Sequence, residues 1–115
     1  MADLNTLRDQ LRTFAAERDW DQFHSPKNLA SALAVEAAEL LEKFQWLTEA
    51  ESRNLPPEGL EGVRQEVADV LLYLIRISDK LGIDLIAAAK AKMALNAQKY
   101  PVELSRGTSR KYDEV

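Results

Sequence analysis

Two short acidic motifs, each on the edge of an apolar stripe, constrain the fold of this chain more than any other feature. Glu36 and Glu39 lie in the segment VEAAELLE, and Glu66 and Asp69 lie in QEVADVLL. At about 100° per residue, the apolar residues around Glu36 and Glu66 recur at helical spacing, so each leading acid projects close to an apolar face. Carboxylates are rarely placed against a core unless a cation compensates them. The sequence therefore predicts either basic partners or a metal ion at both motifs.

A polar break over residues 48–57 separates the two motifs and predicts that they meet in a helical hairpin. The break ends in two prolines, which cannot continue a helix. The last residue before the break lies eight residues after Glu39. The first residue after the break lies eight residues before Glu66. At 1.5 Å per residue, each motif is roughly 12 Å from the turn. In an antiparallel hairpin we therefore expect Glu39 to face Glu66, and Glu36 to face Asp69.

Length and composition exclude several classes of protein. The 115 residues suit one domain, and 46% hydrophobic with 30% charged residues is typical of a globular chain. A net charge of −4 disfavours binding to a nucleic-acid backbone, and the absence of cysteine excludes disulfides and thiolate metal sites. No apolar run approaches the roughly 18 residues that span a bilayer, and the N-terminus lacks a signal-peptide core. We therefore expect a cytoplasmic protein that binds neither nucleic acid nor membrane.

Apolar periodicity, caps and breakers predict an all-α chain. We expect four helices, which cover residues 4–20, 26–47, 57–81 and 85–99. Thr48 and Glu51 have the spacing of a capping box, which predicts one additional helical turn after the second helix. The residues after Pro101 form a polar tail, which we expect to be irregular or ordered only against a partner.

The third predicted helix, residues 57–81, is apolar on nearly every side. Its centre, VLLYLI, could form a buried strand by composition alone, but its length and lack of internal breakers favour a helix. A helix that is apolar all round is buried on all sides. A chain this short has few helices with which to cover it. The sequence therefore predicts a homo-oligomer, at least a dimer, in which this helix contributes to the interface.

The four acids offer only oxygen ligands, which suits Mg²⁺, with Mn²⁺ as the alternative ion. A carboxylate di-iron site would need Glu-x-x-His motifs, and the only histidine, His24, lies in a connector. The structural alternative is two ordinary acidic pairs on helix surfaces, with Lys43 and Arg76 as their partners. Two motifs at matched heights favour the metal site.

Two further groups of residues are candidates for binding a substrate. On the last predicted helix, two ammonium groups and an amide share one face, which suits a phosphate chain and a base edge; this face comprises Lys92, Asn96, Lys99 and Tyr100. Elsewhere, several aromatic rings could stack on a nucleobase: Trp20, Phe23, His24, Trp46 and Tyr73. The alternatives are a solvated lysine face and ordinary core aromatics.

Four segments together resemble one known family. They are RDWDQFHSPKNLA, VEAAELLEKFQW, QEVADVLLYLI and KMALNAQKYP, in this order. On these motifs the chain resembles the all-α nucleotide pyrophosphohydrolases of the MazG-like superfamily, most closely their dCTP pyrophosphatase branch. The likeness covers most of the chain, from about Phe14 to Lys111. It implies a MazG-like domain over residues 1–101, followed by a tail over residues 102–115. The implied fold is a four-helix bundle completed by oligomerisation, as a dimer or a dimer of dimers.

The resemblance also implies roles for individual residues. Four acids would hold Mg²⁺ against a nucleoside triphosphate: Glu36, Glu39, Glu66 and Asp69. Five residues would surround the base and sugar: Trp20, Trp46, Tyr73, Asn96 and Tyr100. Lys92 would contact the phosphates. The chain departs from animal dCTP enzymes at Leu11, where those enzymes have a histidine near the base.

From these observations we expect a Mg²⁺-dependent enzyme that converts a (deoxy)nucleoside triphosphate, dCTP or a modified dCTP first, to the monophosphate and pyrophosphate. Glu36 or Glu39 would orient or deprotonate the attacking water. Such an activity would remove surplus or modified nucleotides. Two alternatives stay open: a dUTP-preferring or broad-specificity pyrophosphatase, and a non-catalytic helical oligomer that binds nucleotides.

Overall fold

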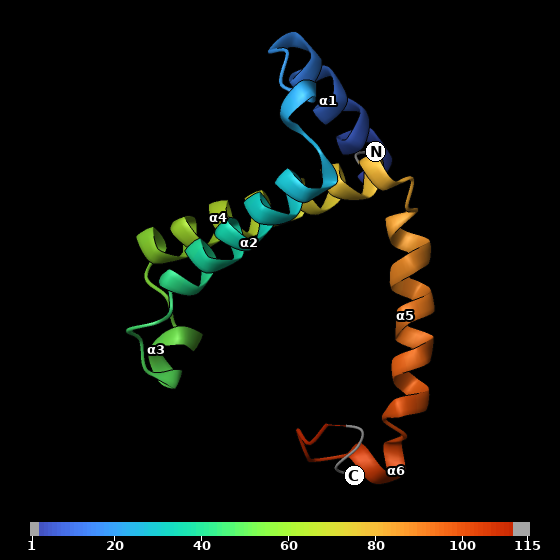
Figure 1. Cartoon of the computed structure of the whole chain (residues 1–115). Coiled ribbons are helices and arrows are strands. Elements are labelled where there is room, and N and C mark those ends of the chain that lie inside the picture. Colours follow the sequence, from blue (N-terminus) through green and yellow to red (C-terminus); the bar gives the residue numbers. More distant parts are fainter. Residues whose placement is uncertain (1–2, 112–115) are drawn as a thin grey trace. The chain divides into compact units, whose positions relative to one another are not determined.

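A computed structural model describes residues 3–111, and this part of the chain contains helices and no strand. The elements are α1 (Leu4–Glu17), the 3-10 turn η1 (Asp21–Phe23), α2 (Pro26–Glu42), α3 (Glu49–Arg53), α4 (Pro57–Leu81), α5 (Leu85–Lys99) and α6 (Val102–Ser105) (Figure 1). The predicted all-α class is confirmed, and the four expected helices are α1, α2, α4 and α5.

Side-chain caps account for where the helices begin. Asp3 accepts a hydrogen bond from the backbone N–H of Thr6 at the start of α1, and Ser25 and Asp84 cap α2 and α5 in the same way. The predicted capping box is present at α3, where Thr48 and Glu51 each accept a hydrogen bond from the other's backbone N–H. These caps satisfy amide donors that the first helical turn leaves without partners.

Two helix ends and one additional helix differ from the sequence prediction. The helix α1 stops at Glu17 rather than near residue 20, because Asp19 adopts a positive φ of 54°. The helix α2 stops at Glu42, and residues 43–47 continue as turns, so this helix is shorter than expected. One short helix, α6, lies in the segment that we expected to be irregular, since the carbonyl of Pro101 accepts hydrogen bonds from the next turn.

The helices α2 and α4 form the antiparallel hairpin that the motifs predict, with α3 in the connection between them (Figure 1). The helix α1 packs against α4. Each of these three helices contributes one buried apolar residue to a small core: Ala15, Leu29 and Ile75. The hairpin places the two acidic motifs side by side.

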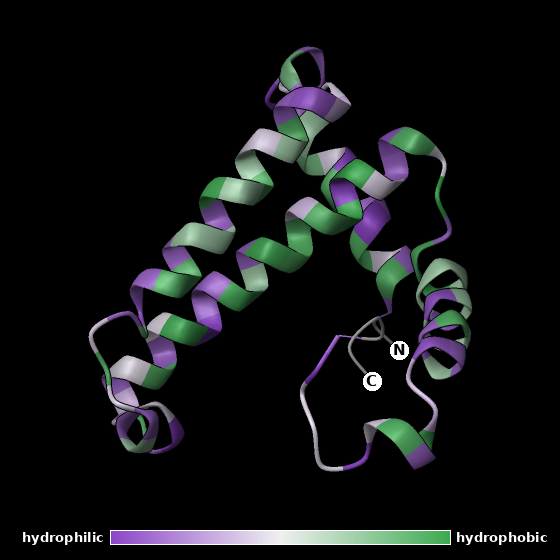
Figure 2. Ribbon diagram, turned by 60° about the horizontal axis from the view of Figure 1, so that its bottom comes forward, coloured by the Kyte–Doolittle hydropathy of each residue, from purple (hydrophilic) through white to green (hydrophobic). Residues whose placement is uncertain are grey.

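Hydrophobic residues recur along α2 and α4 beyond the surfaces on which these helices meet (Figure 2). On α4, Leu60, Val67 and Leu71 share one face at helical spacing, and about half of the Val67 side chain is exposed (50%). Val35 and Leu41 are similarly exposed on α2. Apolar faces of this size agree with the predicted oligomer, which stays a prediction.

The described residues divide into two compact units after Gly82. Gly82 ends α4 in the left-handed conformation, with φ of 67°, which favours glycine. The first unit contains α1 to α4, and the second contains α5 and α6. Among the helices described, none is long and apolar enough to cross a membrane.

Candidate active site

Three acidic side chains converge between α2 and α4. One carboxylate oxygen each from Glu36, Glu39 and Glu66 can be chosen so that all three atoms lie within 4.8 Å of one another. The first two residues are three apart on α2, so their side chains share a flank, and the hairpin brings Glu66 of α4 to the same height. Asp69, one turn further along α4, acts on this cluster through its charge.

Burial, together with the convergence of like charges, raises the affinity of two of the carboxylates for protons. Burial, followed by the hydrogen bond and charge of Glu39, raises the pKa of Glu36 from 4.5 to about 7. Burial and the charge of Glu39 also raise the pKa of Glu66, and nearby Lys43 opposes that shift. Repulsion of this kind marks a site that gains from a bound cation.

The acids lack the basic partners that the structural alternative requires. In the part of the chain that the structure describes, neither Lys43 nor Arg76 forms an ion pair with any of the four acids; Arg76 pairs instead with Asp21 and Asp79. One buried oxygen of Glu36 and one of Glu66 have no hydrogen-bond partner among these residues. Buried oxygens without partners, in an all-oxygen donor set, fit a hard divalent ion such as Mg²⁺.

A cavity of about 270 Å³ adjoins the acidic cluster, because its lining includes Asp69, whose charge acts on Glu36 and Glu66. Its walls come from α1, from the connector between α1 and α2, and from α4. The lining residues are Leu11, Phe14, Ala15, Trp20, His24, Asp69, Leu72, Tyr73 and Arg76. Trp20 packs edge-to-face on Phe14, with 5.7 Å between the ring centroids. A mainly apolar cavity with a few polar groups suits a small organic ligand such as a nucleobase.

Comparisons with known proteins agree with this geometry. A sequence model of the MazG-like family matches residues 32–115. Over 114 residues, the chain is 43% identical to mouse (Mus musculus) dCTP pyrophosphatase 1 and 42% identical to the human (Homo sapiens) protein. Each alignment covers 97% of this chain and 67% of the relative. The chain belongs to the MazG-like family.

A solved structure supports the same assignment for this MazG-like chain. The crystal structure of a pyrophosphatase from Archaeoglobus fulgidus superposes with a TM-score of 0.77 at 42% sequence identity. The match covers 88% of this chain and 94% of the other. Relatives and structure together confirm the predicted class of enzyme, a nucleoside triphosphate pyrophosphohydrolase.

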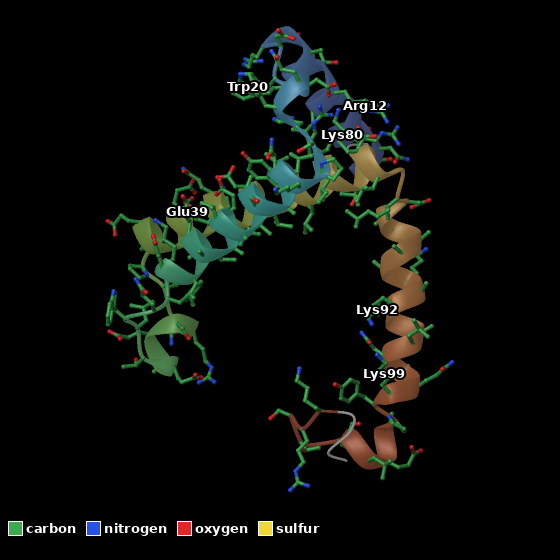
Figure 3. The ribbon with its side chains drawn as sticks, in the orientation of Figure 1. Arg12, Trp20, Glu39, Lys80, Lys92 and Lys99 are labelled. Carbon is green, nitrogen blue, oxygen red and sulfur yellow. The ribbon has the colours of Figure 1, made fainter. Side chains whose placement is uncertain are left out.

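The structure brings some of the predicted substrate-binding residues together. Trp20, His24 and Tyr73 line the cavity beside Asp69. Trp46 does not, because its side chain is 87% exposed in the turns after α2. The remaining four belong to the second unit, on α5 and its C-cap: Lys92, Asn96, Lys99 and Tyr100. Figure 3 labels the two lysines. Their contact with substrate stays a prediction.

Sequence reasoning missed part of the cavity wall of this MazG-like protein. It treated Arg76 only as a partner for the acids, whereas the structure places Arg76 in the cavity lining. The spacing of Asp69, Tyr73 and Arg76, four and then three residues apart, puts them on one face of α4 and could have revealed this. Leu11, singled out by the resemblance, does line the cavity.

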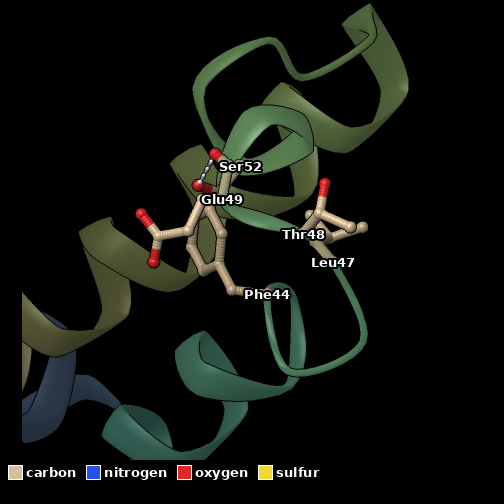
Figure 4. Close-up of a pocket in the computed structure, with 5 residues that line it drawn as sticks. All are labelled: Phe44, Leu47, Thr48, Glu49 and Ser52. Atoms are coloured by element: carbon tan, nitrogen blue, oxygen red, sulfur yellow. Dashed lines mark hydrogen bonds between the residues drawn. The ribbon is translucent and has the colours of Figure 1, made fainter.

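A second hollow lies at the far end of the hairpin, where α3 begins (Figure 4). Its lining residues are Phe44, Leu47, Thr48, Glu49 and Ser52. The Ser52 hydroxyl donates to the backbone carbonyl of Glu49 at 2.7 Å, and the Thr48 hydroxyl serves the capping box. Local hydrogen bonds of α3 therefore account for these two hydroxyl groups, and the hollow suggests no chemistry of its own.

Proposed function

We propose that this protein is a Mg²⁺-dependent enzyme that converts a (deoxy)nucleoside triphosphate to the monophosphate and pyrophosphate. The observation that carries the proposal is the convergence of Glu36, Glu39 and Glu66, with two buried oxygens lacking partners, next to a cavity lined by aromatic rings. Asp69 joins the two regions and completes the proposed ligand set. Mn²⁺ is the alternative ion, because it accepts the same oxygen ligands.

The acidic side chains would have separate roles at the reacting phosphorus. When bound, Mg²⁺ would neutralise the phosphate chain and the charge that develops as the bridging bond breaks. Glu36 or Glu39 would orient the attacking water or take its proton, since oxygens of both carboxylates converge on the same point. Glu66 and Asp69 would complete the binding of the ion from α4.

The cavity would hold the base and sugar. Trp20 and Tyr73 supply aromatic surface for stacking, which does not choose a base because every base has a π-face. The choice would come from polar groups on the base edge, because a wrong base leaves a buried group unpaired. Asn96 is our candidate for this contact, with Lys92 on the phosphates. The named relatives make dCTP or a modified dCTP our first candidate substrate.

We also propose that the enzyme works as a homo-oligomer, a dimer or a dimer of dimers. Three buried apolar residues form a very small core for the described residues, whereas several large apolar side chains on α2 and α4 are exposed. Burial of these faces against a second copy would supply the missing apolar contacts.

A nucleotide panel with product identification tests the proposed activity. The protein would be incubated with the common (deoxy)nucleoside triphosphates and 5-methyl-dCTP, with and without Mg²⁺. We expect monophosphate and pyrophosphate, only with the metal, and the highest kcat/KM for a cytosine deoxynucleotide. A uracil preference or an even spread would favour the broader pyrophosphatase. Nucleotide binding without any product would contradict the proposal.

A further inference from the structure

A buried arginine lies at the end of the cavity opposite the acidic cluster. Arg76, on α4, is 6% exposed and lines the cavity two turns beyond Asp69. Its Nη2 donates to Asp21 Oδ1 at 2.6 Å, and its Nε donates to His24 Nδ1 at 3.1 Å. Its Nη1 lies 3.7 Å from Asp79 Oδ2. Arg76 therefore ties the connector that carries Trp20 to the helix that carries Asp69 and Tyr73.

The two carboxylates in this network do not depend on Arg76 alone. Asp21 also accepts a hydrogen bond from Lys80 at 2.5 Å, and Asp79 accepts one from Arg12 Nε at 2.7 Å; Figure 3 labels Lys80 and Arg12. The imidazole of His24, by contrast, has Arg76 as its only hydrogen-bond partner among residues 3–111. The contact that only Arg76 provides is the one to His24.

That contact determines which nitrogen of His24 carries the proton. Because Nδ1 accepts a hydrogen bond from the guanidinium, the neutral ring must be protonated on Nε2. Burial, followed by the charges of Arg76 and Lys80, lowers the pKa of His24 below 6.5, while Asp21 opposes the shift. The neutral form is therefore favoured, and Nε2 is directed away from Arg76 as a donor.

We infer that Arg76 is a positioning residue for the substrate: it holds His24, a member of the cavity wall, as a hydrogen-bond donor to a carbonyl oxygen of the bound base. This inference rests on the proposed function and names one polar contact on the base edge. Cytosine, uracil and thymine all carry such an oxygen. A protonated imidazole could not accept the hydrogen bond from Arg76, because both of its nitrogens are donors. The other neutral tautomer would present an acceptor instead of a donor to the base.

The sole histidine of the chain permits a direct test by ¹⁵N NMR of the full-length protein without metal or nucleotide. In the wild type we expect one neutral tautomer, protonated on Nε2, and a titration below pH 6.5. In Arg76→Met the titration should move upward and the two tautomers should exchange. Lys80→Met is the matched control, because it removes the other cation from Asp21 but leaves the Arg76–His24 bond. In this control, His24 should keep the tautomer that it has in the wild type.

Steady-state kinetics test whether the tautomer of His24 affects the KM for the substrate. Arg76→Met should raise KM for the preferred nucleotide about tenfold while kcat changes less than threefold, because the acidic cluster is untouched. Lys80→Met should leave KM near that of the wild type. A purely structural network predicts instead that both variants lose thermal stability and neither changes KM selectively.

Two substitutions of His24 separate its two hydrogen bonds. His24→Asn keeps an acceptor near Nδ1 but lacks the outer donor, so it should melt like the wild type and have a raised KM. His24→Gln places an amide donor near Nε2 but withdraws the acceptor from Arg76. This variant should therefore melt at a lower temperature than the wild type, and its KM should lie between those of the wild type and His24→Asn.

The inference is overturned if Arg76→Met keeps both the tautomer and the KM of an active wild type, or if His24→Asn binds substrate normally. An inactive wild type would instead overturn the proposed function, a result that the nucleotide panel identifies before any variant is made.

Discussion

At the residue scale, the acidic cluster predicts that Glu39→Gln and Glu66→Gln lose activity without losing stability. Each removes one charge from a repulsive group and keeps nearly the same volume, so melting temperatures without metal should stay level or rise. Activity should fall at least about 100-fold, as expected for lost electrostatic stabilisation at a reacting centre. Addition of Mg²⁺ should raise the melting temperature of the wild type, because a ligand that binds only the folded state stabilises it.

Thermal melts with and without Mg²⁺, alongside activity assays, make this measurement. Glu61→Gln is the matched control, because it changes the charge of an exposed residue on α4 outside the cluster. The control should keep both the activity and the metal-dependent stabilisation. A wild type that ignores Mg²⁺, with both cluster variants melting well below it, would show that the acids have a structural role.

The raised pKa of Glu36 predicts an unusual pH dependence for the metal-free protein. With a folded pKa of about 7 and an ordinary value of 4.5, the folded state binds the extra proton between these values. Stability without metal should therefore fall as pH rises through this window, and Glu36→Gln should flatten the profile. Since Mg²⁺ requires the ionised carboxylate, its stabilising effect should grow from pH 6 to pH 8. Melts across this range decide both points, and a wild-type profile parallel to that of the variant would contradict the prediction.

At the element scale, one ion pair joins α1 to α4. Arg12 contacts Asp79 through Nε and Nη2, and the Asp79 side chain is only 12% exposed. The hydrogen bond from Arg12 holds the pKa of Asp79 below 3.8. The stabilisation is therefore present above about pH 4 and is lost as pH falls through the lowered pKa.

We expect Asp79→Asn to reduce the free energy of unfolding by about 1–2 kcal/mol at pH 7, because a hydrogen-bonded charge pair at a partly exposed site is lost. Urea unfolding at pH 7 and pH 3 measures this, and the difference from the wild type should shrink at the lower pH. Asp9→Asn is the control, since Asp9 is an exposed acid on α1 whose ion pairs remain within that helix. Equal losses in both variants would argue against a special role for the α1–α4 contact.

At the scale of the whole molecule, the exposed apolar face of α4 predicts self-association. Light scattering at micromolar concentration should give a mass at least twice the 13.0 kDa of one chain. Val67→Arg, which places a charge in the middle of that face, should weaken the assembly. Gln65→Arg, which adds the same charge at an exposed polar position of α4, should not. A folded 13.0 kDa monomer would contradict the prediction.

Local features of the sequence sufficed to predict the helices and the acidic cluster. Caps such as Ser25 and Asp84, together with Gly82, act within a few residues of a helix end, so composition and spacing reveal them. The meeting of Glu39 and Glu66 also follows from local quantities, namely the helical repeat and the equal distance of both motifs from the break. The early ends of α1 and α2 were less predictable, because turn conformations compete closely with one more helical turn.

The partners of the buried arginine in the cavity wall were decided by tertiary structure alone. Arg76 is 52 residues from His24 and 55 from Asp21 in sequence, and no periodicity links positions so far apart. The guanidinium could have paired with the acidic cluster, as the structural alternative requires. Instead, α1 and the connector pack over the end of α4 and bring other partners into reach, so Arg76 binds there and forms no ion pair with the acidic cluster. Spacing along one helix decides which side chains share a face, but only packing between helices decides which charges are neutralised.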